Sequence, residues 1–225
     1  SGGNVAVMEN GEYHNCIYIS YIKKDTDWTS SRLYDKNLNF LADNICSSIS
    51  PDGQQMILYC SNKEGGALYI SHMGETNWDT PEKLGSDINT SGTQTNACLS
   101  PDGNAIYFVS ERMGGMGGKD IWRCVKLPNG EWSRALNLGK PINTPYDEET
   151  PFMHADGHTF FFCSQGHNSM GGYDIFFSQV IDSGKFSEPF NLGYPINTPY
   201  NELHFSLILN AKKGYFNSDR PGGLG

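Results

Sequence analysis

Ser50-Pro51-Asp52-Gly53 is a short stretch that the chain repeats at a nearly constant interval. The same four residues return at 100–103, a weaker copy reads His-Ala-Asp-Gly at 154–157, and Leu-Asn-Ala-Lys at 209–212 keeps the spacing. Successive copies lie 50, 54 and 54 residues apart. A period of this size predicts a repeat architecture, in which each unit buries its apolar faces by packing against its neighbours.

Three other markers recur in the same order and at similar steps. An aromatic residue recurs at Trp28, Trp78, Trp132 and Phe186. Ile-Asn-Thr recurs at 88–90, 142–144 and 196–198. Leu-Tyr-Ile at 68–70 recurs as Ile-Trp-Arg at 121–123 and as Ile-Phe-Phe at 175–177, with a weaker copy, Ile-Tyr-Ile, at 17–19.

Each unit has the pattern of four short strands. In the third full unit the strand-like runs are 150–154, 159–164, 173–180 and 186–192, separated by turns rich in Gly, Asp and Asn. Short β-rich runs between such turns are strand and hairpin signals, and no window shows the 3.6-residue period of an amphipathic helix. Four-stranded units of about 50 residues predict the antiparallel blades of an all-β propeller.

The ends of the chain contain incomplete units. We expect one propeller domain, residues 1–225, with sections at about 5–40, 41–90, 93–144, 147–198 and 201–225. The first section begins near a second strand, with an apolar run at 5–8, and the last supplies only a first and a second strand. Three blades are therefore complete and two are partial.

The number of blades in the ring stays open between four and five. The two partial sections either combine into one composite blade, which closes a four-bladed ring, or stay separate in a ring of five or more blades. The second strand represented at both ends favours the separate arrangement. In either case we expect the domain to be one part of a larger multidomain protein.

Charge and composition narrow the possible partners. The formal net charge is −9, and the 26 Gly and 11 Pro suit a turn-rich chain. The sequence pI is about 5.0 and the mean hydropathy is −0.49. A nucleic-acid binder should carry a basic footprint, and this chain has none. No apolar run approaches the roughly 18 residues that a membrane-spanning helix needs.

The repeat separates architecture from function. Asp52, Asp102 and Asp156 recur once per blade, which marks them as turn residues, and the same reasoning applies to Asp120 and Asp174. The histidines follow no metal-ligand spacing, and no nucleophile-elbow motif occurs. We therefore predict no catalytic residue, no metal site and no cofactor.

The cysteines fit the same interpretation. Cys60 and Cys163 occupy equivalent places in different blades. Equivalent positions lie too far apart for a disulfide, which needs Cα atoms within about 7 Å. We expect the six cysteines to be small buried hydrophobic residues.

Function should lie where the copies differ. The Gly-rich loops join strand to strand, and we expect their glycines to adopt positive φ. Variable residues of these loops should project from one rim of the ring as a partner surface: Arg112, Met113, Met116, His167, Met170 and Arg220. Glu149 and Glu202, 53 residues apart, are interpreted as connection residues, and we expect Tyr146 and Tyr200 to be buried.

The complete pattern resembles a known family. Its elements are Ser-Pro-Asp-Gly, an aromatic strand ending in Ser110 or Ser164, Gly-Gly-x-Asp-Ile-Trp/Phe at 117–122 and 171–176, and a terminal Asn-Leu-Gly-x-Pro-Ile-Asn-Thr. This order resembles the WD40-like Pro-Asp repeat family of TolB-like propellers, over almost all of residues 5–225. The first complete blade departs from it, because Gly65-Gly66-Ala67 lacks the Asp.

The resemblance implies a setting and a function. The fuller pattern is most similar to propeller domains of Bacteroidota envelope proteins that also carry an outer-membrane-protein-A-like domain, one of which belongs to the type IX secretion and gliding apparatus. It implies a non-catalytic scaffold that binds protein partners in the periplasm at the outer membrane, with peptidoglycan contacted only through a flanking domain. The alternative is a glycan-active or glycan-binding propeller.

Overall fold

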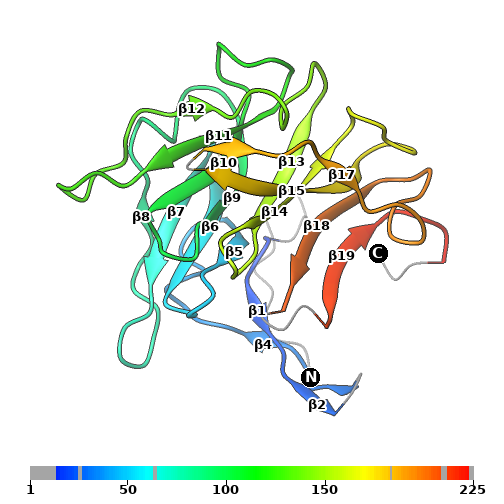
Figure 1. Ribbon diagram of the computed structural model, residues 1–225. Helices are drawn as coiled ribbons and strands as arrows, with labels where there is room; N and C mark the ends of the chain where they lie inside the picture. The colour runs from blue at the N-terminus through cyan, green and yellow to red at the C-terminus, as the bar shows by residue number, and fades with distance from the viewer. Residues whose placement is uncertain (1–13, 25–26, 63–64, 183, 209–211, 223–225) are drawn as a thin grey trace.

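The computed structural model describes residues 14–24, 27–62, 65–182, 184–208 and 212–222. Within these ranges the regular elements are β-strands, in five groups arranged around a common axis (Figure 1). This confirms the predicted all-β propeller. The described residues include no helix that could span a bilayer.

Three groups are complete antiparallel blades whose first strands lie nearest the axis. Blade 2 contains β5 (Asp43–Ile49), β6 (Gln55–Asn62), β7 (Gly65–His72) and β8 (Glu82–Lys83). Blade 3 contains β9 (Gln94–Leu99), β10 (Ala105–Ser110), β11 (Asp120–Val125) and β12 (Leu136–Asn137). Blade 4 contains β13 (Glu148–Met153), β14 (Thr159–Ser164), β15 (Asp174–Asp182), and an outer strand in two pieces, β16 (Lys185–Phe186) and β17 (Phe190–Asn191).

Two groups are partial in the part of the chain that the structure describes. Section 1 contains β1 (Tyr18–Ile19), β2 (Ile22–Lys24), β3 (Asp27–Trp28) and β4 (Arg32–Leu33), which correspond to the outer half of a blade. Section 5 contains β18 (Glu202–Leu207) and β19 (Gly214–Ser218), which correspond to the inner half. The run at 5–8 and most of the fourth turn copy lie outside the described residues.

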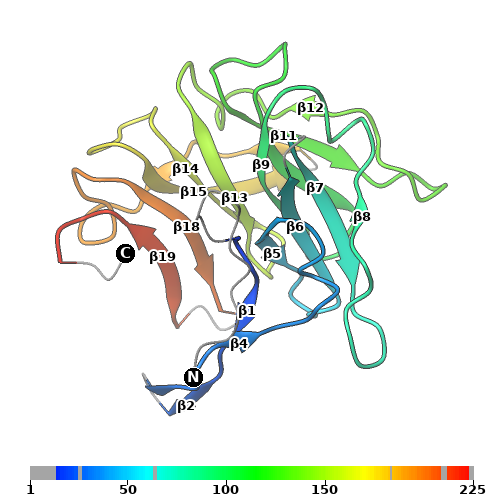
Figure 2. The same ribbon diagram turned by 180° about the vertical axis from the view of Figure 1, so that it is seen from behind.

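Among the described residues the two partial sections are separate neighbours, and their strands do not pair into one composite blade. Their strands belong to different sheets, and section 1 lies between blade 2 and section 5 when viewed from either side (Figures 1 and 2). The rings of Trp28 and Tyr215 meet edge to face at 6.4 Å. Phe186 of blade 4 meets Tyr107 of blade 3 in the same way at 6.3 Å. The structure therefore has the five-section arrangement.

The hydrophobic core lies between the blades. Four buried clusters separate the five sections, and the one between blades 3 and 4 includes Phe160, Phe162 and Phe176. Burying each such ring stabilises the fold by about 1.5–3 kcal/mol. Each cluster also contains one buried cysteine: Cys60, Cys124, Cys98 and Cys163 in ring order. All six cysteines carry free thiols, and burial raises the pKa of these four to about 12.

The Ile-Asn-Thr connection fastens each blade through its asparagine. The Asn143 Oδ1 accepts the backbone N–H of Ile121 at 2.9 Å, and its Nδ2 donates to the Ile121 carbonyl at 2.9 Å. Asn89 and Asn197 hold Leu68 and Ile175 in the same way. Each asparagine amide thus pairs with the backbone of one third-strand residue as a neighbouring strand would.

The Pro-Asp turns have the predicted structural role. The Asp102 carboxylate accepts hydrogen bonds from the Ser100 hydroxyl and the Asn104 backbone N–H, both within its own turn. Gly103 adopts φ of +68° there, a conformation that glycine tolerates best. Asp156 accepts the N–H groups of His158 and Thr159 in the equivalent turn.

Candidate functional site

The four innermost strands enclose a cavity on the ring axis. It has a volume of about 560 Å³ and is lined by β5, β9, β13 and β18, with Asn96, Thr150 and His204 among its polar residues. A second cavity of about 420 Å³ shares Phe152 and Leu207 with it and is more apolar. Among the described lining residues of both cavities there is no carboxylate. We call this combined space the axial cavity.

Bulges direct two residues toward the axis. The strand register shifts between Glu149 and Phe152 in β13, and between Leu203 and Ser206 in β18. Thr150 adopts φ of +47° and His204 φ of +55°, in the left-handed region. A β-branched residue is rare there, and such conformations cost about 1–3 kcal/mol and cluster at functional sites. Both residues line the axial cavity, and the Thr150 hydroxyl donates to the Cys163 thiol at 2.9 Å.

One charged cluster near the axis breaks the repeat. The Glu149 Oε1 accepts the Lys119 ammonium at 2.7 Å, and its Oε2 accepts the Asn96 amide at 2.9 Å. The Thr95 hydroxyl lies 3.2 Å from both carboxylate oxygens. This cluster joins blades 3 and 4, and the equivalent of Glu149 in β18 is Leu203.

The pairing of Glu149 with Glu202 in the sequence was therefore wrong. A step of 54 residues aligns Glu202 with Glu148, and both have the same hydrogen-bond partners: the threonine of the connection and a serine that ends the second strand. Because Glu202 corresponds to Glu148 at this step, Glu149 is left without an acidic equivalent in β18.

The opposite charges of Lys119 and Glu149 compensate each other within the cluster. Burial opposes ionisation of Lys119, but its hydrogen bond and ion pair with Glu149 raise the pKa of the ammonium above its usual value. Burial lowers the pKa of His204, and the negative charge of Glu149 opposes that change. With its carboxylate committed to three partners, Glu149 is better suited to holding blades together than to proton transfer.

Three of the predicted partner-surface residues have contacts within the ring. Arg112 donates to the carbonyls of Asp87 and Ile88 and lies over the ring of Phe108 at 4.7 Å. Arg220 donates to the carbonyls of Pro195 and Ile196, and its NH2 lies 3.0 Å from Glu202 Oε1.

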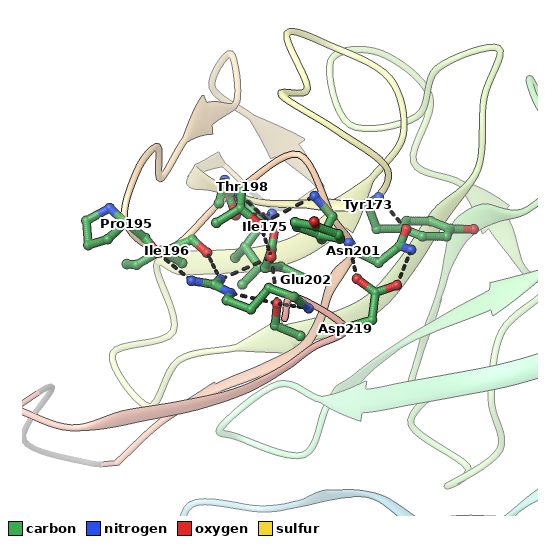
Figure 3. A network of polar contacts seen from close by, with 12 residues as sticks. Tyr173, Ile175, Pro195, Ile196, Thr198, Asn201, Glu202 and Asp219 are labelled. Carbon is green, nitrogen blue, oxygen red and sulfur yellow. Dashed lines mark hydrogen bonds and ion pairs between the residues drawn. The ribbon is translucent and has the colours of Figure 1, made fainter. Parts of the chain in front are cut away.

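His167 occupies the equivalent place in blade 4. Its Nε2 lies 3.0 Å from the Ile142 carbonyl, and the ring packs against Phe162 and Phe176. In blade 3, blade 4 and section 5 one such residue therefore fastens the preceding connection, and the network around Glu202, Thr198 and Ile196 can be followed in Figure 3. The polar heads of Arg112, His167 and Arg220 are thus engaged within the ring.

The other three predicted residues point into solvent. Met113 is 99% exposed, and Met116 and Met170 are also exposed. Their loops are fixed from within, because Asp120 accepts the backbone N–H of Met116 at 2.7 Å and Asp174 accepts that of Met170 at 2.6 Å. The structure thus brings the methionines to the surface of ordered loops, and their role in partner binding stays a prediction.

The glycines of these loops serve a purpose that differs from the predicted one. Of Gly114, Gly115, Gly117 and Gly118, positive φ occurs at Gly114. A Cβ at Gly117 would lie 2.0 Å from the Tyr146 carbonyl oxygen, and one at Gly171 would lie 2.3 Å from the carbonyl carbon of Pro199. These glycines allow the loop backbone to pack directly on the connection.

Tyr146 and Tyr200 are exposed, which corrects the expectation that they are buried. Their exposed fractions are 61% and 43%. The Gly-rich loops pack on the backbone of the connections, at the Tyr146 carbonyl and at Pro199. The two tyrosine rings are not needed for this packing and stay exposed. We define the loop rim as the exposed side chains of Met113, Met116, Tyr146, Met170 and Tyr200. The described residues hold no cluster of three or more His, Cys, Asp or Glu that could bind a metal ion.

Comparisons with known proteins define the fold class. No protein-family profile and no curated protein matches the chain. TolB from Acinetobacter baumannii is 15% identical with a TM-score of 0.50, over 81% of this chain and 40% of that one. A putative TolB from Agrobacterium tumefaciens is 16% identical with a TM-score of 0.52, over 93% and 79%. The chain therefore has the TolB-like β-propeller fold, and it spans less than half of the Acinetobacter protein.

Proposed function

We propose that the chain is a non-catalytic protein-docking domain of a bacterial envelope protein, and that the loop rim is its docking surface. The observation that carries this proposal is the pair of exposed methionine loops whose backbones are held by buried Asp120 and Asp174. Methionine adapts to varied apolar surfaces, and a backbone ordered in advance reduces the entropy lost on binding.

The proposed setting is the periplasm, in an outer-membrane-associated complex of the type IX secretion and gliding kind. The resemblance of the repeat pattern to Bacteroidota envelope propellers supports this setting, and the fold shared with the TolB structures is consistent with it. A non-catalytic role is supported by the axial cavity, whose described lining lacks the paired carboxylates that glycoside hydrolysis requires.

Affinity purification of the intact parent protein tests the proposal. The test variant replaces Met113, Met116 and Met170 by Glu, and the control variant replaces Leu136, Ile181 and Phe190, which are exposed on the outer side, by Glu. We expect envelope proteins to co-purify with the wild type and the control but not with the test variant. Equal recovery with the test variant would reject the loop rim, and no envelope protein above background would reject the docking function.

Glycan binding is the second candidate, favoured by Tyr146 and Tyr200. These exposed rings lie 54 residues apart at equivalent places on the loop rim, and an aromatic face can stack on the apolar face of a sugar while its hydroxyl stays hydrated. Calorimetry with soluble peptidoglycan fragments tests this function. Binding that is abolished by Tyr146→Ala with Tyr200→Ala, and kept in the methionine variant, would favour the glycan function over protein docking.

A further inference from the structure

A pocket of about 490 Å³ lies between blades 3 and 4 on the rim that carries the Pro-Asp turns. Asp102 of one turn and Asp156 of the next line it, together with Tyr107, Arg123 and Lys126. It shares Met153 and Ala155 with the apolar part of the axial cavity but none of its polar residues, and it lies away from the loop rim.

Arg123 is the residue that makes this pocket different from the equivalent places in other blades. The strand register aligns Arg123, which is opposite Tyr107, with Ile70 opposite Ile57 and with Phe177 opposite Phe161. Blades 2 and 4 therefore have an apolar residue where blade 3 has a guanidinium. The architecture of the ring does not require a charge there.

The Arg123 guanidinium has no anionic partner in the described part of the chain. Its Nε is buried without a hydrogen bond, and its Cζ lies over the Tyr107 ring, 6.0 Å from the ring centroid. An added Cβ at Gly184 would lie 2.5 Å from the Arg123 NH1, so the glycine of the blade 4 hairpin leaves space for the guanidinium. A half-buried cation without a partner is costly, because the buried donor loses water and gains nothing in return.

The chemistry of the lining selects the ligand. A guanidinium presents parallel N–H donors that match the two oxygens of a carboxylate. The carboxylates of Asp102 and Asp156 are held by their own turns. Arg123 and Lys126 balance these two carboxylates, so the lining has no net charge. This balance disfavours a multiply charged anion and favours a ligand with a cation beside its carboxylate.

We propose that this pocket binds the carboxylate of an acidic residue in a partner polypeptide through Arg123, with an adjacent basic residue of that partner facing Asp102 and Asp156. The site is separate from the loop rim and adds a second contact to the ring. The proposal stands even where docking at the loop rim fails, because it depends on different residues.

Nuclear magnetic resonance of the Arg123 Nε–H group tests the binding. The probe is the N-acetylated, C-amidated dipeptide lysyl-glutamate, and the matched control is the lysyl-glutamine dipeptide. We expect a saturable shift with the first and none with the second. No shift, an equal shift with both dipeptides, or a larger shift with inorganic phosphate would overturn the proposal.

Two variants separate binding from folding. In Arg123→Lys the point charge remains but the forked donor is lost, so the shift of the Gly184 amide on adding lysyl-glutamate should weaken. In Arg123→Ile, which restores the blade 2 residue, that shift should vanish while the melting temperature rises by about 2–4 °C, because an unpaired, half-buried cation is removed. A melting temperature that falls in Arg123→Ile, or an unchanged Gly184 shift in either variant, would show that Arg123 is structural and overturn the proposal.

Discussion

One position in three successive sections contains a polar side chain that is hydrogen-bonded to the threonine of the connection. The residues at this position are Gln94, Glu148 and Glu202. Glu202 also has Arg220 as a cationic partner. Glu148 has His167 in the equivalent place, and the His167 Nε2 lies 3.0 Å from the Ile142 carbonyl oxygen. Burial therefore raises the pKa of Glu148 to about 7, although hydrogen bonds from Thr144 and Ser164 oppose the shift.

Glu148→Gln should stabilise the protein at pH 8. Because the folded-state pKa lies above the usual value near 4.5, the native state binds more protons between these values, and wild-type stability falls as pH rises from about 4.5 to 7. Glutamine removes that loss, on the order of 3 kcal/mol, and Gln94 shows that the amide fits. Urea unfolding at pH 5 and pH 8 measures the difference.

Glu202→Gln is the matched control. It removes the ionic partner of Arg220 and should destabilise the fold by about 1–2 kcal/mol at pH 8. If both glutamine variants change the unfolding free energy in the same direction, the presence of Arg220 beside Glu202 and of His167 beside Glu148 does not decide how each carboxylate affects stability.

His167→Arg should supply the missing cation to Glu148. The new guanidinium would lie over Phe162 and Phe176, as Arg220 lies over Phe216. We expect the Glu148 pKa to fall below 7, observable by carboxyl-carbon titration. His167→Gln, which carries no charge, should leave that pKa raised, and an equal fall in both variants would contradict the prediction.

At the scale of elements, the Gly-rich loops depend on close backbone approach. Gly117→Ala brings its Cβ against the Tyr146 carbonyl and should cost about 1–3 kcal/mol of unfolding free energy. Gly85→Ala is the control, since nothing lies within 4 Å of its Cβ and its φ is unexceptional. Chemical denaturation of the two variants measures the contrast, and equal effects would mean that the loop moves to accept a side chain.

The inner strands could be predicted from the sequence and the outer ones only in part. The predicted run 159–164 matches β14, because a continuous β-rich run between turns leaves little choice of boundary. The predicted outer strand 186–192 is broken into β16 and β17. Pro189 lacks an N–H, and the Ser187 hydroxyl accepts the Gln179 N–H at 2.9 Å in place of a backbone carbonyl.

At the scale of the whole molecule, the repeat allowed prediction of the ring but not of its charged exceptions. Glu149, Lys119 and Asn96 lie on different elements, so their meeting depends on how blades 3 and 4 dock. The exposure of Tyr146 likewise depends on the Gly117 backbone packing beneath it. Spacing along one chain contains no information about such contacts between blades.

Ring closure predicts an energetic coupling between distant parts of the chain. A double-mutant cycle of Trp28→Ala and Tyr215→Ala should give a coupling energy of about 0.5–1.5 kcal/mol, because the two rings meet across the junction of sections 1 and 5. The matched cycle uses Phe186 and Tyr107 between blades 4 and 3. Coupling in the matched cycle but none between Trp28 and Tyr215 would mean that the junction is open in solution.

The buried thiols can report how the ring unfolds, because each interface between neighbouring sections contains one of them. Cys60, Cys124, Cys98 and Cys163 each belong to a different interface between sections, and burial holds their pKa at about 12. A thiol reagent can therefore reach each one only after its own interface has separated. The order in which the unmodified protein is labelled would report the order in which its blades come apart.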